Sequence, residues 1–249
     1  MQPFFPITPC KVALAFVVVI LGNYVLPAKD LVDPVQIIDL ARSYYGQENL
    51  LDSVRTIYYE GQVLEPGEGK VPGNFRMFLK KPMCQRIELQ SGDIVDIRAT
   101  NGLEGYWMRL DKASGKKQVA VLDSGRLETM IVGALENLNF LKATDHRRRD
   151  VWFRELTRYQ GAPCYKLRFQ YKDVIYYDRL VDAASGRILL TEDNQGLQIH
   201  QRGDVFANGI RFPKNLESYQ GRKHVNTLLI SLVLLNSEIP DSFFDFPDS

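Results

Sequence analysis

The chain has 249 residues, of which 45% are hydrophobic, and its 31 basic and 30 acidic residues give a formal net charge of +1. This balance provides no broad positive field and therefore argues against binding to nucleic acid. Three cysteines are also too few for the disulfide framework of a small secreted domain.

An apolar run near the N-terminus, Val12 to Leu21, indicates an export signal. Ten residues of helix cover about 15 Å, half of the membrane's hydrocarbon core of about 30 Å. Lys11 precedes the run, and Pro27 follows it beside a small residue, as in a cleaved secretory signal. We expect residues 1–28 to be removed on export and residues 29–249 to form one domain. An uncleaved anchor is the alternative.

The cysteines fit the same interpretation. Cys10 lies before the apolar run, whereas a lipid-modified cysteine follows it, so we expect Cys10 to be removed with the signal. Cys84 and Cys164 then remain in an oxidising compartment. They either form a single disulfide or behave as two small buried hydrophobic residues.

A helix is predicted directly after the signal. Asp33 suits the N-cap, Pro34 suits the first helical position, and Gly46 suits a left-handed end. A short second turn is expected around residues 49–53. The apolar residues of the first helix share one face: Ile37, Ile38, Ala41 and Tyr45.

Short segments with alternating apolar residues follow the helix, separated by glycine-containing turns about every ten residues. The clearest is CYKLRFQYKD, residues 164–173, with four apolar or aromatic residues on one face and charged or amide residues on the other. The segments NFRMFLKK and QRIELQ repeat this pattern. It predicts an antiparallel meander of hairpins.

One amphipathic helix interrupts the strands, within DSGRLETMIVGALENLNFLKATDH. Ser124 is its expected cap. The helix either covers one face of the sheet and completes the core, or serves as a lid above an apolar pocket. The following residues 146–149, HRRR, form a solvated loop or lie near an anionic headgroup. Apolar residues recur at helical spacing: Leu127, Met130, Ile131, Ala134, Leu135, Leu138 and Leu141.

A search for catalytic or metal-binding motifs finds none. The three histidines are scattered, there is no Cys-x-x-Cys or Gly-x-Ser-x-Gly motif, and residues 67–70 lack the spacing of a phosphate loop. We therefore expect no metal, no cofactor and no enzymatic activity.

Near the C-terminus the run LLISLVLL, residues 228–235, is too short to span a membrane. As a strand it has apolar residues on both faces, so we expect both faces to be buried. The segment SFFDFP, residues 242–247, is expected to add a last core strand.

The order of these elements resembles the periplasmic outer-membrane lipoprotein-sorting proteins, the LolA and LolB group and its relatives. The resemblance covers nearly the whole mature chain. It rests on the signal, the segments ARSYYGQENLLDSVRTIYYEGQV and TNGLEGYWMRLDKASGKK, the mid-chain helix, YYDRLVDAASGRILLTED, and the close from GIRFPKNLESYQG to LNSEIPDSFFDFP.

The resemblance implies an α+β fold, a curved antiparallel sheet or unclosed β-barrel whose concave apolar face is covered by helices. The cavity beneath the helices would take acyl chains. The receptor branch has a cysteine after its signal, and this chain has none, so it looks like the soluble carrier branch. The sorting proteins also use a basic residue in the cavity, whose counterpart the sequence does not identify.

We therefore expect a monomeric periplasmic carrier of lipid or lipoprotein acyl chains, with envelope membrane proteins as further partners. The alternative is an envelope sensor with the same fold. Related stress-response regulators carry a second C-terminal domain, whereas Ser249 follows directly after the last strand pattern. The expected ligand-binding residues are Phe75, Met77, Ile87, Leu89, Met130, Ile131, Ala134, Leu135, Leu138, Leu167 and Phe169.

Overall fold

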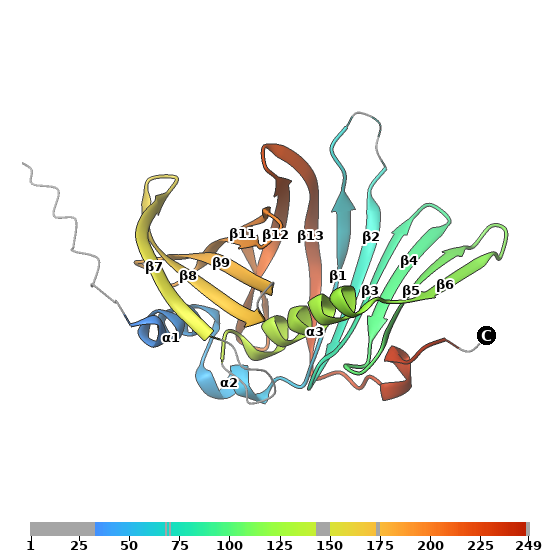
Figure 1. Cartoon of the computed structure of the whole chain (residues 1–249), viewed down its shortest axis with the longest axis horizontal. Helices are drawn as coiled ribbons and strands as arrows, with labels where there is room; N and C mark the ends of the chain where they lie inside the picture. The colour runs from blue at the N-terminus through green and yellow to red at the C-terminus, as the bar shows by residue number, and fades with distance from the viewer. Residues whose placement is uncertain (1–32, 68, 70, 143–149, 173–174, 248–249) are drawn as a thin grey trace, which may run out of the picture.

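A computed structural model describes residues 33–247 except 68, 70, 143–149 and 173–174. Within this part of the chain, thirteen strands form one antiparallel sheet, and a long helix crosses its inner face (Figure 1). Two short helices pack at one end of the sheet. The helices are α1 (Pro34–Tyr45), α2 (Glu48–Ser53), α3 (Ser124–Asn139) and the 3₁₀ turn η1 (Asp241–Phe244).

The strands follow one another around the sheet almost in chain order. They are β1 (Thr56–Leu64), β2 (Gly73–Lys80), β3 (Cys84–Ser91), β4 (Ile94–Thr100), β5 (Gly105–Asp111), β6 (Lys117–Val121), β7 (Asp150–Tyr159), β8 (Ala162–Lys172), β9 (Ile175–Asp182), β10 (Ile188–Asp193), β11 (Leu197–Ala207), β12 (Ile210–Gln220) and β13 (Lys223–Leu235).

The first and last strands meet in the middle of the sheet, where β1 pairs with β13, and the sheet's two edges are β6 and β7. Each edge strand has one neighbour among the described strands, so the barrel is not closed. The helix α3 connects these two edges along the chain. This arrangement confirms the predicted curved, unclosed antiparallel sheet with a helix over its concave face.

The predicted N-cap and buried apolar face of α1 are confirmed. The Asp33 carboxylate accepts a hydrogen bond from the Val35 amide at 2.9 Å, and Ile37 and Ala41 are fully buried. The prediction for Gly46 is wrong, because its backbone is extended, with φ of 164°, and not left-handed. Lack of space explains the glycine at position 46 better, because a Cβ there would lie only 3.3 Å from the carbonyl oxygen of Gly209.

Both ends of α3 differ from the prediction. The N-cap is Asp123, whose carboxylate accepts a hydrogen bond from the Arg126 amide at 2.9 Å, and Ser124 is the first helical residue. The helix ends at Asn139, and Phe140 and Leu141 have left-handed backbones with φ of 45° and 68°. Leu141 is therefore buried beyond the helix and not on its face.

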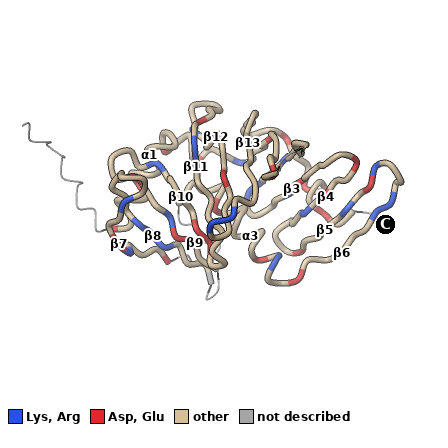
Figure 2. The backbone as a smooth tube through the Cα atoms, turned by 90° about the horizontal axis from the view of Figure 1, so that it is seen from above, with Lys and Arg blue, Asp and Glu red and all other residues tan. Residues whose placement is uncertain are grey.

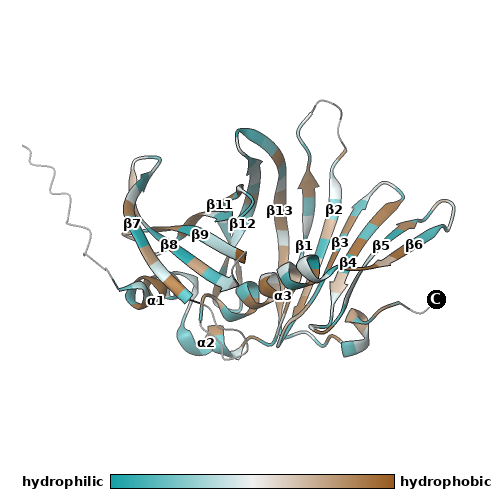
Figure 3. Cartoon of the chain, viewed as in Figure 1, coloured by the Kyte–Doolittle hydropathy of each residue, from teal (hydrophilic) through white to brown (hydrophobic). Residues whose placement is uncertain are grey.

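The strand patterns are confirmed where one face meets the core. In β8, Tyr165, Leu167 and Phe169 are buried under α1. Hydrophobic and hydrophilic residues alternate along several strands (Figure 3), and charges of both signs are spread along the backbone (Figure 2). Cys84 and Cys164 are both buried, and they do not form a disulfide.

Two C-terminal predictions are wrong. The outer face of β13 is not buried, since Leu232 and Leu234 are 40% and 43% exposed on the side away from the core. The segment after it forms η1 and not a strand. Phe243 of η1 packs against Phe78 of β2, with ring centroids 4.8 Å apart, so the tail covers part of the outer face.

The export signal, Cys10 and the HRRR segment lie outside the described residues. Among the helices that the structure describes, none has the length and apolar character needed to cross a membrane.

Candidate functional site

A cavity of about 310 Å³ lies between the inner face of the sheet and the second half of α3. Strands from both halves of the sheet contribute to its wall, and the helix forms its roof. The residues around it are Tyr45, Tyr59, Phe75, Met77, Gly133, Glu136, Asn137, Phe140, Leu141, Tyr177, Arg179, Ile188, Thr191, Ile199, Gln201, Phe212, Pro213, Leu216, Leu228 and Ile230.

Aromatic side chains pack against one another in much of the cavity wall. The rings of Tyr59 and Phe212 meet edge to face with centroids 5.7 Å apart, and Phe140 lies 5.9 Å from Phe212. Phe75 and Ile230 are also buried in this cluster. These side chains come from adjacent strands and from the end of α3, so folding of the sheet creates the apolar surface before any ligand is present.

One ion pair lies in this otherwise mostly apolar site. The guanidinium of Arg179, on β9, pairs with the carboxylate of Glu136, on α3, and both side chains are at least nine-tenths buried. Arg179 also lies over the Phe169 ring, 4.7 Å from its centroid. No described residue accepts a hydrogen bond from its Nε.

This ion pair connects the helix to the sheet. Removing one partner of a buried pair is costly because the other charge is left without compensation in a medium of low polarity. Glu136 and Arg179 therefore hold α3 over the cavity in a specific position. Among the described residues that line the cavity, Arg179 is the only cation.

Three tyrosines line the cavity: Tyr45, Tyr59 and Tyr177. Burial raises the pKa of Tyr45 to about 12 and that of Tyr177 to about 12, because it disfavours the phenolate. Both side chains therefore remain protonated at neutral pH and offer hydrogen bonds without adding a charge.

The end of α3 is fixed by Arg42, on α1. Its Nη1 donates hydrogen bonds to the carbonyl oxygens of Asn139 and Phe140 at 2.9 and 2.7 Å. These groups have no partner within a helix, so the arginine acts as a cap for them. Arg42 is only 4% exposed, and it lies 97 and 98 residues before the two residues whose carbonyl groups it contacts.

Two carboxylates and a lysine complete this anchor. Arg42 pairs with Glu48 and Asp52, and Lys142 contacts the same two carboxylates. A hydrogen bond from Arg42 is the main cause that lowers the pKa of Glu48, and one from Lys142 is the main cause for Asp52. The helix is thus anchored at its C-terminal end and held over the cavity by one ion pair.

The structure brings only part of the predicted binding set to the cavity. Phe75 and Met77 line it, and Ala134 and Leu138 pack in the same core cluster. Leu167 and Phe169 pack under α1 in a second cluster. The others are placed as follows: Ile131 and Leu135 are buried in α3, Met130 and Ile87 are partly buried, and Leu89 is 39% exposed.

The predicted set omitted the two charged residues of the cavity. Arg179 does carry a signal, because it follows Tyr177 and precedes Val181 at the inward positions of β9, where a charge is unusual. Glu136 lies beside the apolar stripe of α3 and gives a weaker signal. That these two residues meet depends on how the helix crosses the sheet, which periodicity does not reveal.

Neither the models of known protein families nor the curated protein sequences give a match to this chain. Solved structures do. A DUF1329 family protein from Desulfovibrio piger superposes with a TM-score of 0.56 at 15% identity, over 86% of this chain and 98% of the other. A LolA superfamily protein from Nitrosomonas europaea gives 0.54 at 12% identity, over 85% and 97%. The chain has the LolA-like fold.

A third LolA-like structure, a putative outer-membrane lipoprotein-sorting protein domain from Vibrio parahaemolyticus, gives a TM-score of 0.55 at 12% identity, over 84% of this chain and 95% of the other. At these identities the likeness concerns the LolA-like fold and not the activity. The resemblance read from the sequence also implied a basic residue in the cavity, and Arg179 lies in that cavity.

Proposed function

We propose that the protein is a periplasmic carrier that binds the acyl chains of a lipid or lipoprotein between the sheet and α3. The observation that supports this most directly is the preformed cavity, with walls built largely from aliphatic and aromatic side chains. An acyl chain gains about 0.8 kcal/mol for each methylene that leaves water. Binding therefore requires no catalytic group, and we propose that the ligand is bound and released without chemical change.

The size of the cavity fits a binding mode in which α3 moves. A volume of about 310 Å³ is near the lower end of the range of about 300 to 1,000 Å³ for ligand pockets. A long chain would need more room than this. The helix is fixed by Arg42 at one end, so rotation about that end would enlarge the cavity once Glu136 separates from Arg179.

Two glycines in α3 allow a sharp test of the binding site. Gly133 lines the cavity, and a Cβ added there makes only ordinary contact, at 3.5 Å, with the Gln85 side chain. Gly125 lies at the exposed start of the same helix. Leucine at either position raises helix propensity, by about 0.5 to 1 kcal/mol in a helix interior, but only residue 133 borders the cavity.

We expect Gly133→Leu to weaken binding of a fluorescent fatty acid at least about tenfold, because the new side chain takes the place of about two methylenes of ligand. Gly125→Leu should leave the affinity unchanged. Fluorescence titration of the two variants and the wild type measures this. Equal affinities in all three proteins would show that the probe does not bind under α3.

A further inference from the structure

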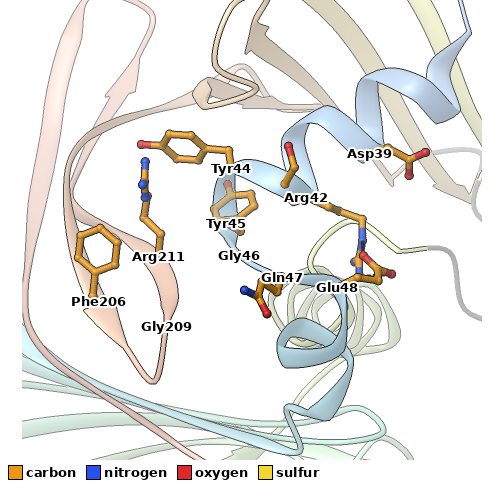
Figure 4. Close-up of a pocket in the computed structure, with 11 residues that line it drawn as sticks. Asp39, Arg42, Tyr44, Tyr45, Gly46, Gln47, Glu48, Phe206, Gly209 and Arg211 are labelled. Atoms are coloured by element: carbon orange, nitrogen blue, oxygen red, sulfur yellow. Dashed lines mark hydrogen bonds and ion pairs between the residues drawn. The ribbon is translucent and has the colours of Figure 1, made fainter.

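A second hollow lies outside the cavity, between the C-terminal end of α1 and the hairpin of β11 and β12 (Figure 4). It has a volume of about 690 Å³. Tyr45 borders both this outer groove and the inner cavity. The two spaces are therefore neighbours that share one aromatic side chain as a wall.

Arg211 is the main cation of the outer groove. Its neighbours Ile210 and Phe212 are buried on the inner side of β12, so Arg211 is on the opposite side of the strand. Its guanidinium lies 4.3 Å from the ring centroid of Tyr44 and 5.2 Å from that of Phe206, the residue paired with it across the hairpin (Figure 4). The two rings hold the planar group in a fixed orientation.

The hydrogen-bonding capacity of Arg211 is largely unused. Nε has no hydrogen-bond acceptor among the described residues, and Nη1 lies 4.0 Å from the Asp204 carboxylate. Asp204 instead accepts hydrogen bonds from the Tyr44 hydroxyl at 3.0 and 3.1 Å. A guanidinium that is fixed by stacking and has free donors is suited to bind a phosphate or carboxylate.

The local charge balance also favours an anion at this end of the groove. Asp204 lies near two guanidinium groups, with Arg187 at 3.8 Å and Arg211 at 4.0 Å. One carboxylate therefore faces two cations. The acidic residues that line the groove itself, Asp39 and Glu48, lie at its far end, where Glu48 pairs with Arg42 (Figure 4).

We propose that the outer groove binds the anionic polar group of the same ligand whose acyl chain enters the cavity, with Arg211 as its principal contact. This inference rests on the proposed function and adds the chemistry of the ligand's polar end. Tyr45 would mark the boundary between the two parts. The groove is larger than the cavity, and charged side chains make up a larger share of the residues that line it, as an amphiphile with a bulky anionic head requires.

The test uses two fluorescent single-chain probes that differ only at their polar end, one a phosphate monoester and the other the corresponding alcohol. Affinities are measured for the wild type and for Arg211→Gln, Arg211→Lys and Arg202→Gln. Arg202 is the matched control, because it is an arginine of β11 that pairs with Glu217 and does not line the groove. Inorganic phosphate is titrated separately.

We expect the wild type to bind the phosphate probe about tenfold more tightly than the alcohol, since hydrogen bonds to charged groups are the stronger class. Arg211→Gln should reduce this preference to less than about twofold without changing the affinity for the alcohol. Arg211→Lys should retain part of it, and Arg202→Gln all of it. An unchanged preference in Arg211→Gln would overturn the assignment of the groove.

Two further outcomes would overturn different parts of the proposal. If inorganic phosphate alone binds as tightly as the phosphate probe, the groove is a site for a free anion, and its link to the cavity is wrong. If neither probe binds the wild type, the carrier function itself is wrong, and the groove loses its ligand with it. Binding of the alcohol probe to the wild type would show that the carrier function holds even where the groove assignment fails.

Discussion

At the scale of single residues, Arg42 determines where α3 ends. Its guanidinium donates hydrogen bonds to the carbonyl oxygens of Phe140 and of Asn139, which also accepts one from the Lys142 amide, at the turn where Phe140 and Leu141 adopt left-handed backbones. An unsatisfied buried carbonyl costs about 1 to 3 kcal/mol. The arginine is therefore a structural requirement for the roof of the cavity and not a surface charge.

We expect Arg42→Met to lower the free energy of unfolding by about 2 to 3 kcal/mol, because at least one of these carbonyl groups loses its partner in a buried place. Urea denaturation measures the change. Arg109→Met is the control: Arg109 binds Asp96 through two hydrogen bonds of 2.8 Å at the surface, and exposed pairs contribute less than about 1 kcal/mol. Equal losses in both variants would contradict the special role of Arg42.

The same variant should change how stability depends on pH. The folded state lowers the pKa of Glu48 below its ordinary 4.5 and that of Asp52 below its ordinary 3.8. Their contribution is therefore complete above those ordinary values and is lost as the pH falls through the lowered ones. Arg42→Met removes the main cause of the Glu48 shift, so its stability should fall less steeply than that of the wild type below about pH 5. Parallel curves would argue against this pairing.

At the scale of elements, α3 is held by different forces along its length. Its apolar side chains pack on the sheet, its C-terminal end is capped by Arg42, and Glu136 pairs with Arg179 across the cavity. In the last of these contacts, both partners line the cavity. Under the proposed function, we expect rupture of this ion pair to open the site.

Glu136→Gln should make the backbone amides of α3 exchange hydrogen at least about tenfold faster, because loss of one partner in a buried ion pair weakens the contact by several kcal/mol. Hydrogen-exchange mass spectrometry measures this, with β8 as the internal reference. Arg126→Gln, at an exposed position of the same helix, should have no such effect. Exchange that rises equally in α3 and β8 would indicate general destabilisation instead.

How far the elements could be predicted depends on how local their causes are. The alternation in β8 and the cap at Asp33 are local, and both predictions hold. The end of α3 is not local, because Arg42 lies 98 residues before Phe140. The apolar run of β13 likewise suggested burial on both faces, yet its outer leucines stay partly exposed, and the 3₁₀ turn that follows packs on Phe78 of β2.

The candidate site shows the same limit. Phe75 and Met77 were identifiable as inward-facing residues of a strand, and they line the cavity. Residues such as Leu167 and Phe169 have equally good patterns but are buried under α1. Periodicity identifies the inward face of an element, whereas the course of the helices over the sheet decides which part of that face remains open.

At the scale of the whole molecule, the unclosed sheet gives the cavity its access. The strands β6 and β7 end the sheet at opposite edges, and α3 passes between these edges over the concave face. A closed barrel would require its strands to separate before a ligand entered. Under the proposed carrier function, movement of one helix would be enough for uptake and release of the ligand.

Native mass spectrometry of the protein isolated from its own cell envelope shows whether the cavity holds acyl chains, as we propose. We predict a species heavier than the unliganded chain by the mass of one lipid or acylated peptide, and that species should be lost in Gly133→Leu and kept in Gly125→Leu. Wild-type protein that carries only a stoichiometric regulatory protein, and no acyl compound, would contradict the claim and favour the sensor alternative.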